Sequence, residues 1–377
     1  MNTPFIFGTI ATGENYTDRE TETRHLVDNF NALTNTIIIS PRRWGKSSLV
    51  HRAGKIAAEK NKDLRICFID LFNVRDEMHF YELFAQKVIA ATATKWDEVI
   101  ENTKKLIGGV IPRLSLSDGI GSGISFDFKF DKNDLDPDKI LDLPEKLAEK
   151  KNIKIIVCID EFQNIGDFKD ADYIYRRLRS HWQLHQNVAY CLFGSKRHMM
   201  MEIFSNSSKP FYKFGDLFFL NKISRQYWIP FFMDRFKETG KELDAENADL
   251  IAALVEDHPY YCQQLAQIAW LRTNDVCTRD IINESHVVLR EQLSLIFENI
   301  TSLLSDQQVA YLHALIDGNE KLTSMEVMQK YGIKSSTASL RAKASLIDND
   351  ILDVISGKIY FQDPLYQFWL RSIYFAT

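Results

Sequence analysis

The segment from residue 36 to residue 53 constrains the fold more than any other stretch of this chain. A β-branched apolar run at 36–39 leads into a turn that contains Gly-Lys-Ser, and a helix-compatible segment follows. This order of strand, loop and helix presents backbone N–H groups and a helix N-terminus to an anion. The predicted phosphate-binding loop consists of Ser40, Pro41, Arg42, Arg43, Trp44, Gly45, Lys46, Ser47 and Ser48.

Two side chains of this loop have predicted roles. Lys46 would reach the β- and γ-phosphates of a bound nucleotide. The Ser47 hydroxyl would bind Mg²⁺, a hard cation that prefers oxygen ligands. The usual pattern begins with Gly, where this chain has Ser40, but Pro41 directs residue 40 toward extended geometry that a small Ser adopts. The alternative is a chance Gly-Lys-Ser at a strand–helix junction.

A pair of acidic residues follows a second predicted strand. The run 154–159 is continuously apolar after its first residue and ends in Asp160 and Glu161. Such a run is typical of a strand covered by helices on both faces, and ligands collect at the carboxyl ends of strands in open α/β sheets. We therefore expect Asp160 to serve Mg²⁺ and Glu161 to orient or deprotonate the attacking water in phosphoryl transfer. A solvated acidic turn is the alternative.

Further strands are predicted at 64–70, 188–195 and 216–220, with helices at 77–99 and 171–186 between them. Alternating strands and helices predict an α/β fold with a mostly parallel five-stranded sheet. Ser195, at the end of its strand, would hydrogen-bond the γ-phosphate or the water. The helix at 171–186 carries Arg176, Arg177 and Arg179, either arginine fingers or, as we favour, a solvated basic face.

The rest of the chain suggests three domains. We assign 1–223 to the α/β domain, with a glycine-rich insertion at about 108–132 that forms either a mobile loop or a two-stranded ribbon. Residues 224–303 form a helical lid, which is not a nucleic-acid surface because 224–300 holds seven basic and thirteen acidic side chains. Residues 304–377 form a winged-helix domain of three helices and a hairpin.

The winged-helix segment raises the question of DNA. Its predicted reading helix, 335–347, would offer Ser335, Ser336, Thr337 and Ser339 to phosphates or bases. The segment from 305 nevertheless carries seven basic and eight acidic residues, whereas DNA sites usually concentrate basic charge. DNA binding and a packing role both stay open.

Composition limits the partners and the cellular compartment that we expect for this chain. The 377 residues are 45% hydrophobic and 26% charged with a net charge of −5, which is globular and argues against wholesale electrostatic binding to nucleic acid. The five cysteines show no C-x-x-C spacing, so we expect buried thiols in a reducing cytoplasm. No apolar stretch approaches bilayer length, so we expect a soluble cytoplasmic protein without a membrane partner.

Near the N-terminus, Thr17 or Asp18 can cap a helix that runs through Leu26 and Phe30. Either this is a plain capped helix or the segment contacts a base. Further on, His258-Pro259 predicts the start of another helix.

Taken together, segments 41–47, 159–163 and 193–195 resemble the archaeal-type ATPase family, a branch of the STAND group of P-loop NTPases related to AAA+ proteins. The resemblance implies ATP as the nucleotide, a helical lid and a winged helix. It also implies that Asp18 and Arg19, within 15–22, lie near the adenine and that Pro259 approaches the nucleotide. Residues 363–371 match the family's ending. Ser40 and Asp257 replace family glycines, and no arginine finger can be assigned.

Three hypotheses follow from these patterns. The first is a Mg²⁺-dependent ATPase switch, in which ATP between the α/β domain and the lid reorients the winged helix and Glu161-assisted hydrolysis resets it. The second is a DNA-binding regulator in which ATP is mainly structural. The third is an interaction scaffold that binds a protein partner or a second copy of itself.

Overall fold

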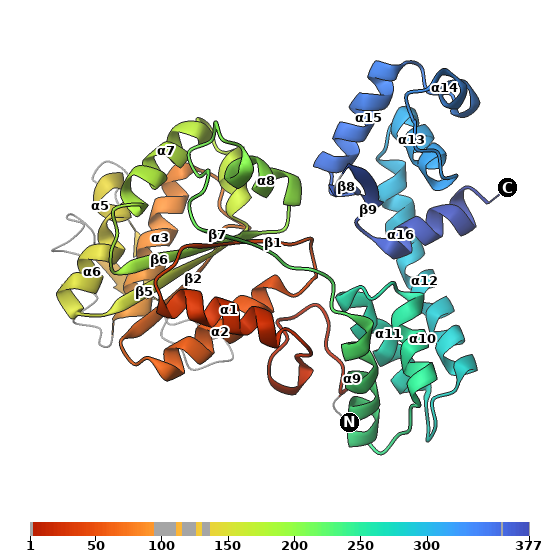
Figure 1. The fold of residues 1–377 in the computed structure, drawn as a ribbon, viewed down its shortest axis with the longest axis horizontal. Helices are drawn as coiled ribbons and strands as arrows, with labels where there is room; N and C mark the ends of the chain where they lie inside the picture. The colour runs from red at the N-terminus through yellow and green to blue at the C-terminus, as the bar shows by residue number, and fades with distance from the viewer. Residues whose placement is uncertain (1–2, 94–110, 115–125, 130–135, 356, 377) are drawn as a thin grey trace. The chain divides into compact units, whose positions relative to one another are not determined.

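The computed structural model describes residues 3–93, 111–114, 126–129, 136–355 and 357–376 (Figure 1). By its internal contacts the chain divides into two units. The α/β unit comprises Arg19–Arg42 and Lys46–Leu220, and the helical unit comprises Met1–Asp18, Arg43–Gly45 and Asn221–Thr377. The predicted boundaries at 223 and 303 stay predictions.

A five-stranded sheet forms the centre of the α/β unit. Its strands are β1 (Thr36–Ile39), β2 (Leu64–Asp70), β5 (Lys154–Asp160), β6 (Val188–Gly194) and β7 (Asp216–Phe219). Their order is β2-β5-β6-β1-β7, and every pairing is parallel. The predicted α/β class and mostly parallel five-stranded sheet are confirmed. In this order β1, which enters the phosphate loop, lies next to β6, and β6 lies next to β5.

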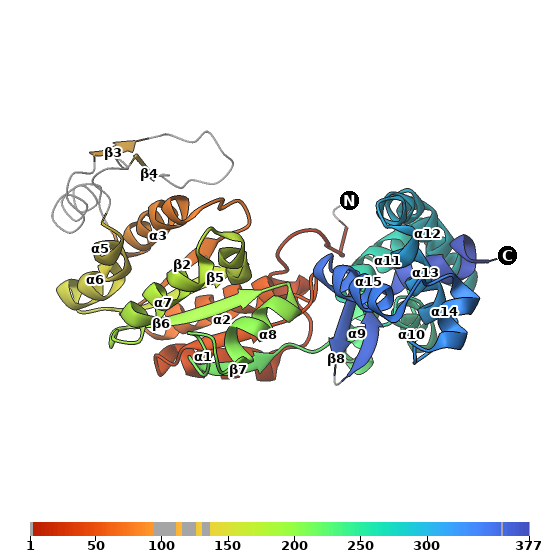
Figure 2. The same ribbon diagram turned by 90° about the horizontal axis from the view of Figure 1, so that it is seen from above.

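Helices cover both faces of this sheet (Figures 1 and 2). One face packs on α1 (Glu20–Asn31) and α2 (Lys46–Lys60), and alternate strand residues such as Ile38, Cys158 and Cys191 join that core. The other face packs on five further helices, with Ile37, Val157 and Leu192 in between. Because strand side chains alternate between faces, two buried faces require the near-continuous apolar runs seen in the sequence.

The helices of the second face are α3 (Glu77–Thr92), α5 (Pro137–Leu141), α6 (Leu143–Lys151), α7 (Ala171–Trp182) and α8 (Arg197–Ser205). The predicted insertion contains the antiparallel pair β3 (Ile111–Leu114) and β4 (Phe126–Lys129), beside α3 (Figure 2). The ribbon interpretation is therefore confirmed for these residues. The rest of the insertion, and the predicted helix beyond residue 93, lie outside the described residues.

The start of α1 differs from the prediction. Neither Thr17 nor Asp18 caps this helix; its N-cap is Arg19, without a side-chain capping bond. Asp18 (φ 59°) and Arg19 (φ 74°) both adopt left-handed backbone, which turns the chain sharply before Glu20. The Arg19 guanidinium lies 2.9 Å from the Glu22 carboxylate, so a salt bridge across the first turn replaces the expected cap.

The helical unit contains a short 3₁₀ turn, η1 (Gly13–Asn15), and then α9 (Arg225–Glu238), α10 (Ala245–Leu254), α11 (Pro259–Arg272) and α12 (Arg279–Ser302). Pro259 is the first residue of α11, as predicted. The later elements are α13 (Asp306–Ile316), α14 (Met325–Tyr331), α15 (Ser336–Asp348), β8 (Leu352–Ile355), β9 (Lys358–Phe361) and α16 (Pro364–Trp369), followed by a π-helical turn at Leu370–Tyr374. One continuous apolar core connects these helices.

The chain's ending has a structural explanation. Asp363 caps α16 by accepting bonds from the backbone N–H groups of Leu365 and Tyr366, and the Tyr261 hydroxyl donates to its second oxygen. Trp369 Nε1 donates to Ser294 Oγ on α12 at 2.8 Å. These bonds, together with Pro364 at the first helical position, fasten α16 to α11 and α12.

Two further observations bear on the sequence analysis. All five cysteines are free and buried, as expected. Across the described residues, the structure contains no helix with the length and apolar character needed to cross a bilayer.

Candidate active site

The phosphate loop joins β1 to α2, which begins at Lys46. Gly45 has φ +88°, a conformation that favours glycine. The backbone of the loop therefore explains why the motif has glycine at this position. Ser40 is fully buried, lies outside the left-handed region and donates its hydroxyl to the Pro41 carbonyl at 3.1 Å. No glycine is needed at residue 40, which explains how this chain departs from the usual pattern.

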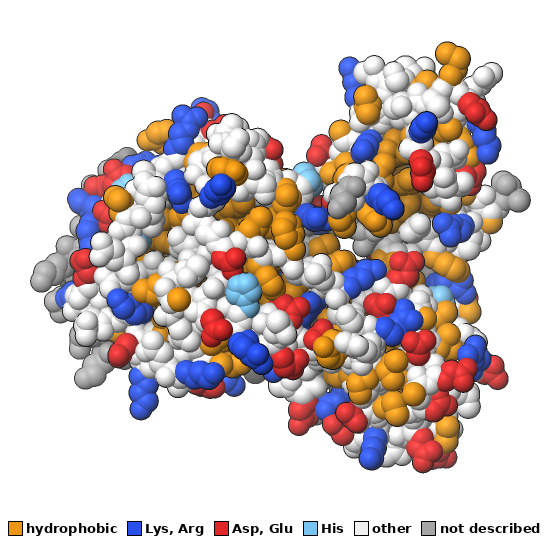
Figure 3. Space-filling view, in the orientation of Figure 1, with side chains coloured by type: hydrophobic (Ala, Val, Ile, Leu, Met, Phe, Trp, Pro, Cys, Tyr) orange, Lys and Arg blue, Asp and Glu red, His pale blue; other side chains and the backbone are white. Residues whose placement is uncertain are grey.

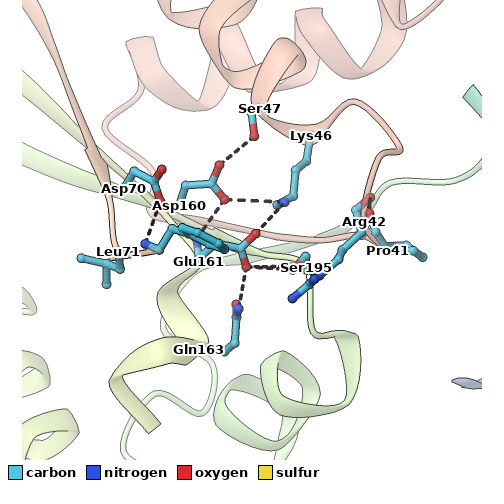
Figure 4. Close-up of polar contacts among 12 residues, drawn as sticks. Pro41, Arg42, Lys46, Ser47, Asp70, Leu71, Asp160, Glu161, Gln163 and Ser195 are labelled. Carbon is cyan, nitrogen blue, oxygen red and sulfur yellow. Dashed lines mark hydrogen bonds and ion pairs between the residues drawn. The ribbon is translucent and has the colours of Figure 1, made fainter. Parts of the chain in front are cut away.

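The loop and the end of β5 bring opposite charges together (Figure 4). Ser47 Oγ donates to Asp160 Oδ2 at 2.7 Å. Lys46 Nζ lies 3.6 Å from Asp160 Oδ1 and 3.2 Å from Glu161 Oε1. The Lys46 side chain is only 10% exposed, so these ion pairs are poorly screened by solvent.

Glu161 is held from several directions. Its backbone is left-handed (φ 52°), and its N–H donates to Asp160 Oδ1 at 2.9 Å. Oε2 accepts from the backbone N–H and the hydroxyl of Ser195, at 3.1 and 2.8 Å, and from Gln163 Nε2 at 2.5 Å. Arg42 Nε in turn donates to Ser195 Oγ at 3.2 Å. The structure thus brings together Arg42, Lys46 and Ser47 with Asp160, Glu161 and Ser195, six of the predicted site residues.

Burial and these contacts shift the two carboxyl groups in opposite directions. Burial raises the pKa of Asp160, although the Lys46 ammonium and the Ser47 hydroxyl oppose the rise. Burial also works to raise the pKa of Glu161, but Lys46, Gln163 and Ser195 together outweigh it and leave that pKa lowered. Glu161 is consequently held as an anion at neutral pH.

The donor set suits Mg²⁺. Among the described residues there is no group of three or more His, Cys, Asp or Glu side chains that could hold a metal ion by themselves. Mg²⁺ rarely uses such a cage; it takes one or two protein oxygens and completes its shell with phosphates and water. Ser47 Oγ and the Asp160 carboxylate supply two adjacent oxygens of this kind.

The remaining predicted residues lie elsewhere. Arg19 is buried in its pair with Glu22, and Ser48 is buried in α2. Asp18, Arg43, Trp44, Gly45 and Pro259 group with the helical unit, where Arg43 lies over the Tyr260 ring at 4.5 Å. Their roles toward a nucleotide stay predictions.

Two arginines of α7 have partners within the α/β unit. Arg177 Nε lies 2.8 Å from Asp138 Oδ1, and Arg179 covers the Phe214 ring at 4.7 Å. These contacts give both side chains a packing role.

The residue that sequence reasoning missed is Gln163. It lies inside the segment 159–163, for which the sequence analysis predicts roles only at Asp160 and Glu161. The available signal is its spacing of two residues from Glu161, because a turn directly after a strand can bring side chains at this spacing into contact.

A known protein family matches more than half of this chain. The profile of the family described as "ATPase domain predominantly from Archaea" matches residues 16–265. The chain belongs to this family. The protein is therefore an ATP-binding ATPase with a P-loop NTPase fold, as predicted. A search of curated proteins gives no match.

Solved structures share the fold of this ATPase. The Walker-type ATPase PABY2304 of Pyrococcus abyssi is 16% identical, with a TM-score of 0.67 over 98% of this chain and 100% of that one. ORC2 of Aeropyrum pernix, with ADPNP and ADP, is 13% identical, with a TM-score of 0.60 over 98% and 96%. ORC1 of Aeropyrum pernix, in complex with DNA, is 11% identical, with a TM-score of 0.50 over 96% and 93%.

Proposed function

We propose that this protein hydrolyses ATP in a Mg²⁺-dependent reaction and uses the cycle as a conformational switch. The observation that carries the proposal is the meeting of Lys46 and Ser47, from the start of α2, with Asp160, Glu161 and Ser195, from the ends of β5 and β6. Five side chains from three parts of the sequence converge where an open α/β sheet binds its ligand.

Each residue has a defined task in this proposal. Lys46 binds the β- and γ-phosphates in place of its present carboxylate partners, while Ser47 and Asp160 hold the metal. When bound between these two residues, Mg²⁺ would neutralise the phosphate charge that develops during transfer. Glu161, an anion at neutral pH, orients the attacking water, and Ser195 donates to the γ-phosphate or to that water.

The test is phosphate release from ATP and from GTP, with and without Mg²⁺, alongside nucleotide-affinity titrations. Lys46→Ala should abolish release and weaken ATP binding, whereas Glu161→Gln should abolish release and still bind ATP. Lys55→Ala is the matched control, since Lys55 lies on the same helix with its side chain 78% exposed. An inactive wild type in the presence of Mg²⁺-ATP would contradict the proposed reaction.

The switch is the finer part of the proposal. The phosphate loop is itself divided between the two units, because Arg42 and Lys46 group with one and Arg43–Gly45 with the other. In this proposal, a nucleotide bound to the loop changes the conformation of the chain and its hydrolysis reverses the change. Limited proteolysis of Glu161→Gln with ATP, with ADP and without nucleotide should give distinct cleavage patterns; identical patterns would argue against a switch.

A winged-helix interaction with DNA is the second candidate function. Helices α14 and α15 follow one another through a turn at Gly332 (φ 72°), and the β8–β9 ribbon comes next. Ser336, Thr337 and Arg341 are exposed on α15. Ser339, by contrast, is buried and donates to the Leu322 carbonyl at 2.8 Å, so the prediction that it touches DNA is wrong.

Charge argues for modest DNA affinity. Acidic side chains gather over α9–α12, and both signs are mixed over α13–α15 (Figure 3). Duplex binding that falls steeply with salt, weakens in Arg341→Ala and is unaffected by Lys46→Ala would support a regulator in which ATP is mainly structural. Absence of binding at low salt would leave α13–α15 as a surface for a protein partner or a second copy.

The cellular setting forms part of the same proposal. Five free, buried thiols suit a reducing cytoplasm, and we propose that compartment for the protein. Membership of the STAND branch is proposed on the motifs at 41–47, 159–163 and 193–195.

A further inference from the structure

Gln163 is a buried polar side chain with an unusual arrangement of its amide. The residue is 1% exposed, and its Nε2 donates to Glu161 Oε2 at 2.5 Å and to Asn164 Oδ1 at 3.3 Å. Its Oε1 is buried, and it has no hydrogen-bond partner among the described residues. Flipping the amide would point this oxygen at the Glu161 carboxylate, so the observed orientation is the one that electrostatics permits.

Gly194 provides the space for this amide. A Cβ built on Gly194 would overlap Gln163 Oε1, and it would also lie 3.0 Å from Met200 Sδ. The backbone of Gly194 is not left-handed, so conformation does not explain the glycine. The missing side chain is therefore a steric requirement of Gln163, whose amide packs against Gly194 at the end of β6.

The two oxygens of Glu161 have different surroundings. Oε2 accepts three hydrogen bonds, one from Gln163 and two from Ser195. Oε1 faces Lys46 Nζ at 3.2 Å. If Lys46 turns to the phosphates of bound ATP, Oε1 is released while Oε2 stays anchored (Figure 4).

We propose that Gln163 is a positioning residue for ATP hydrolysis: it anchors Oε2 of Glu161 so that Oε1 is the oxygen that orients the attacking water. Gly194 serves the same task by leaving room for the amide. This inference rests on the proposed role of Glu161 in ATP hydrolysis. It assigns no contact with ATP to Gln163, which acts through Glu161.

The experiment uses the full chain and three variants: Gln163→Ala, Gly194→Ala and the double variant. Gln163→Ala should lower kcat about tenfold, a typical size for loss of an orienting group, with the Kd for ATP changed less than about twofold. Gly194→Ala should lower kcat similarly because it displaces the amide. The double variant should match Gln163→Ala alone, since the truncated side chain leaves space for the new methyl group.

A second readout separates positioning from simple destabilisation. A fall in kcat with a nearly unchanged Kd for ATP is the result expected of lost positioning, because removal of one donor misorients Glu161 without removing a contact with ATP. Melting temperatures report folding, and Ser195→Ala is a comparison variant that removes another donor to the same oxygen.

The outcomes are distinct. An unchanged kcat in folded Gln163→Ala, or additive losses in the double variant, would overturn the role of Gln163 while leaving the ATPase intact. If Gly194→Ala does not fold, the kcat of the single Gln163 variant and its Kd for ATP still decide. A wild type that releases no phosphate from Mg²⁺-ATP would instead remove the proposed function on which this inference rests.

Discussion

Glu161, after β5, and Asp257, between α10 and α11, are two carboxylates held in left-handed backbone, with φ of 52° and 57°. Each faces a cation: Lys46 in the first case and Arg225 in the second. For residues other than glycine this conformation costs roughly 1–2 kcal/mol, somewhat less for Asp, so the surrounding contacts must hold it.

The two regions differ in what holds the carboxylate. Lys46 is a single charge shared between Asp160 and Glu161 at more than 3 Å, a partner that a phosphate can replace. Arg225 grips Asp257 with two parallel bonds, Nε to Oδ1 at 2.5 Å and Nη2 to Oδ2 at 2.9 Å. A bidentate pair of this kind fixes the relative orientation of the two side chains.

The backbone around Asp257 explains its strain. The N–H groups of Glu256 and Asp257 donate to the carbonyls of Ala253 and Ala252, which closes α10 in a Schellman turn with Glu256 (φ 52°) at the position usually held by glycine. Asp257 (φ 57°) follows this turn directly, and Arg225 holds its carboxylate. The same left-handed backbone thus occurs at Glu161, a proposed catalytic residue, and at the chain reversal around Asp257.

The largest expected effect contrasts these two carboxylates directly. Glu161→Gln should lower ATP turnover by a factor of about 10²–10⁴, the usual contribution of a positioned acid–base group. Asp257→Asn should change turnover by less than about threefold, because the amide keeps the turn. Steady-state phosphate release measures both; a loss of comparable size in Asp257→Asn would place Asp257 in the reaction and break the contrast.

Arg225→Ala tests the structural pair. It removes the two hydrogen bonds from Arg225 to the partly buried Asp257 carboxylate, so we expect the free energy of unfolding to fall by about 1–3 kcal/mol. Arg225→Lys keeps the charge but not the two parallel bonds and should lose about half as much. Denaturant unfolding of the full chain measures the change. Unaltered stability in Arg225→Ala would show that the turn does not depend on this pair.

Asp160→Asn tests whether the buried carboxylate of the site lowers the free energy of unfolding. Because the folded state raises the pKa of Asp160, its contribution to stability is fully present below the unfolded value near 3.8 and is lost as pH rises through the raised pKa. At pH 7 the ionised group therefore destabilises the nucleotide-free protein. Asp160→Asn should raise its stability by about 1 kcal/mol, or a few degrees in Tm, and abolish turnover.

The control for this change is pH itself. The advantage of Asp160→Asn over the wild type should shrink as the pH is lowered through the raised pKa, where the wild-type carboxyl becomes neutral. A variant that is less stable than wild type at pH 7 would mean that the Lys46 and Ser47 contacts more than offset burial.

Asp257→Gly should have the smallest effect. Glycine removes a left-handed strain of about 1 kcal/mol, while loss of the Arg225 pair costs a similar amount, so the net change should stay below about 0.5 kcal/mol. Asp257→Ala keeps the strain and loses the pair, so it should be less stable than Asp257→Gly. Equal stability of the Gly and Ala variants in denaturant unfolding would show that strain at residue 257 is negligible.

Much of the α/β unit could be predicted because its signals are local. The run at 36–39, the Gly-Lys-Ser turn and the apolar strand before Asp160 each carry their own structural preference. The N-cap of α1 could not be predicted in this way: Thr17 and Asp18 are good caps, but Arg19 takes the position in left-handed backbone. Local preference was overridden there by the path of the chain.

The sequence by itself determined the order of strands and helices, the phosphate loop and the identity of the acidic pair, because periodicity and turn chemistry act within a few residues. Tertiary structure decided which side chains share a partner. Gln163 reaches Glu161 because Gly194, on a neighbouring strand, leaves room, and Arg225 reaches Asp257 across 32 residues. Such pairings depend on the register of strands and the packing of helices, which no local pattern encodes.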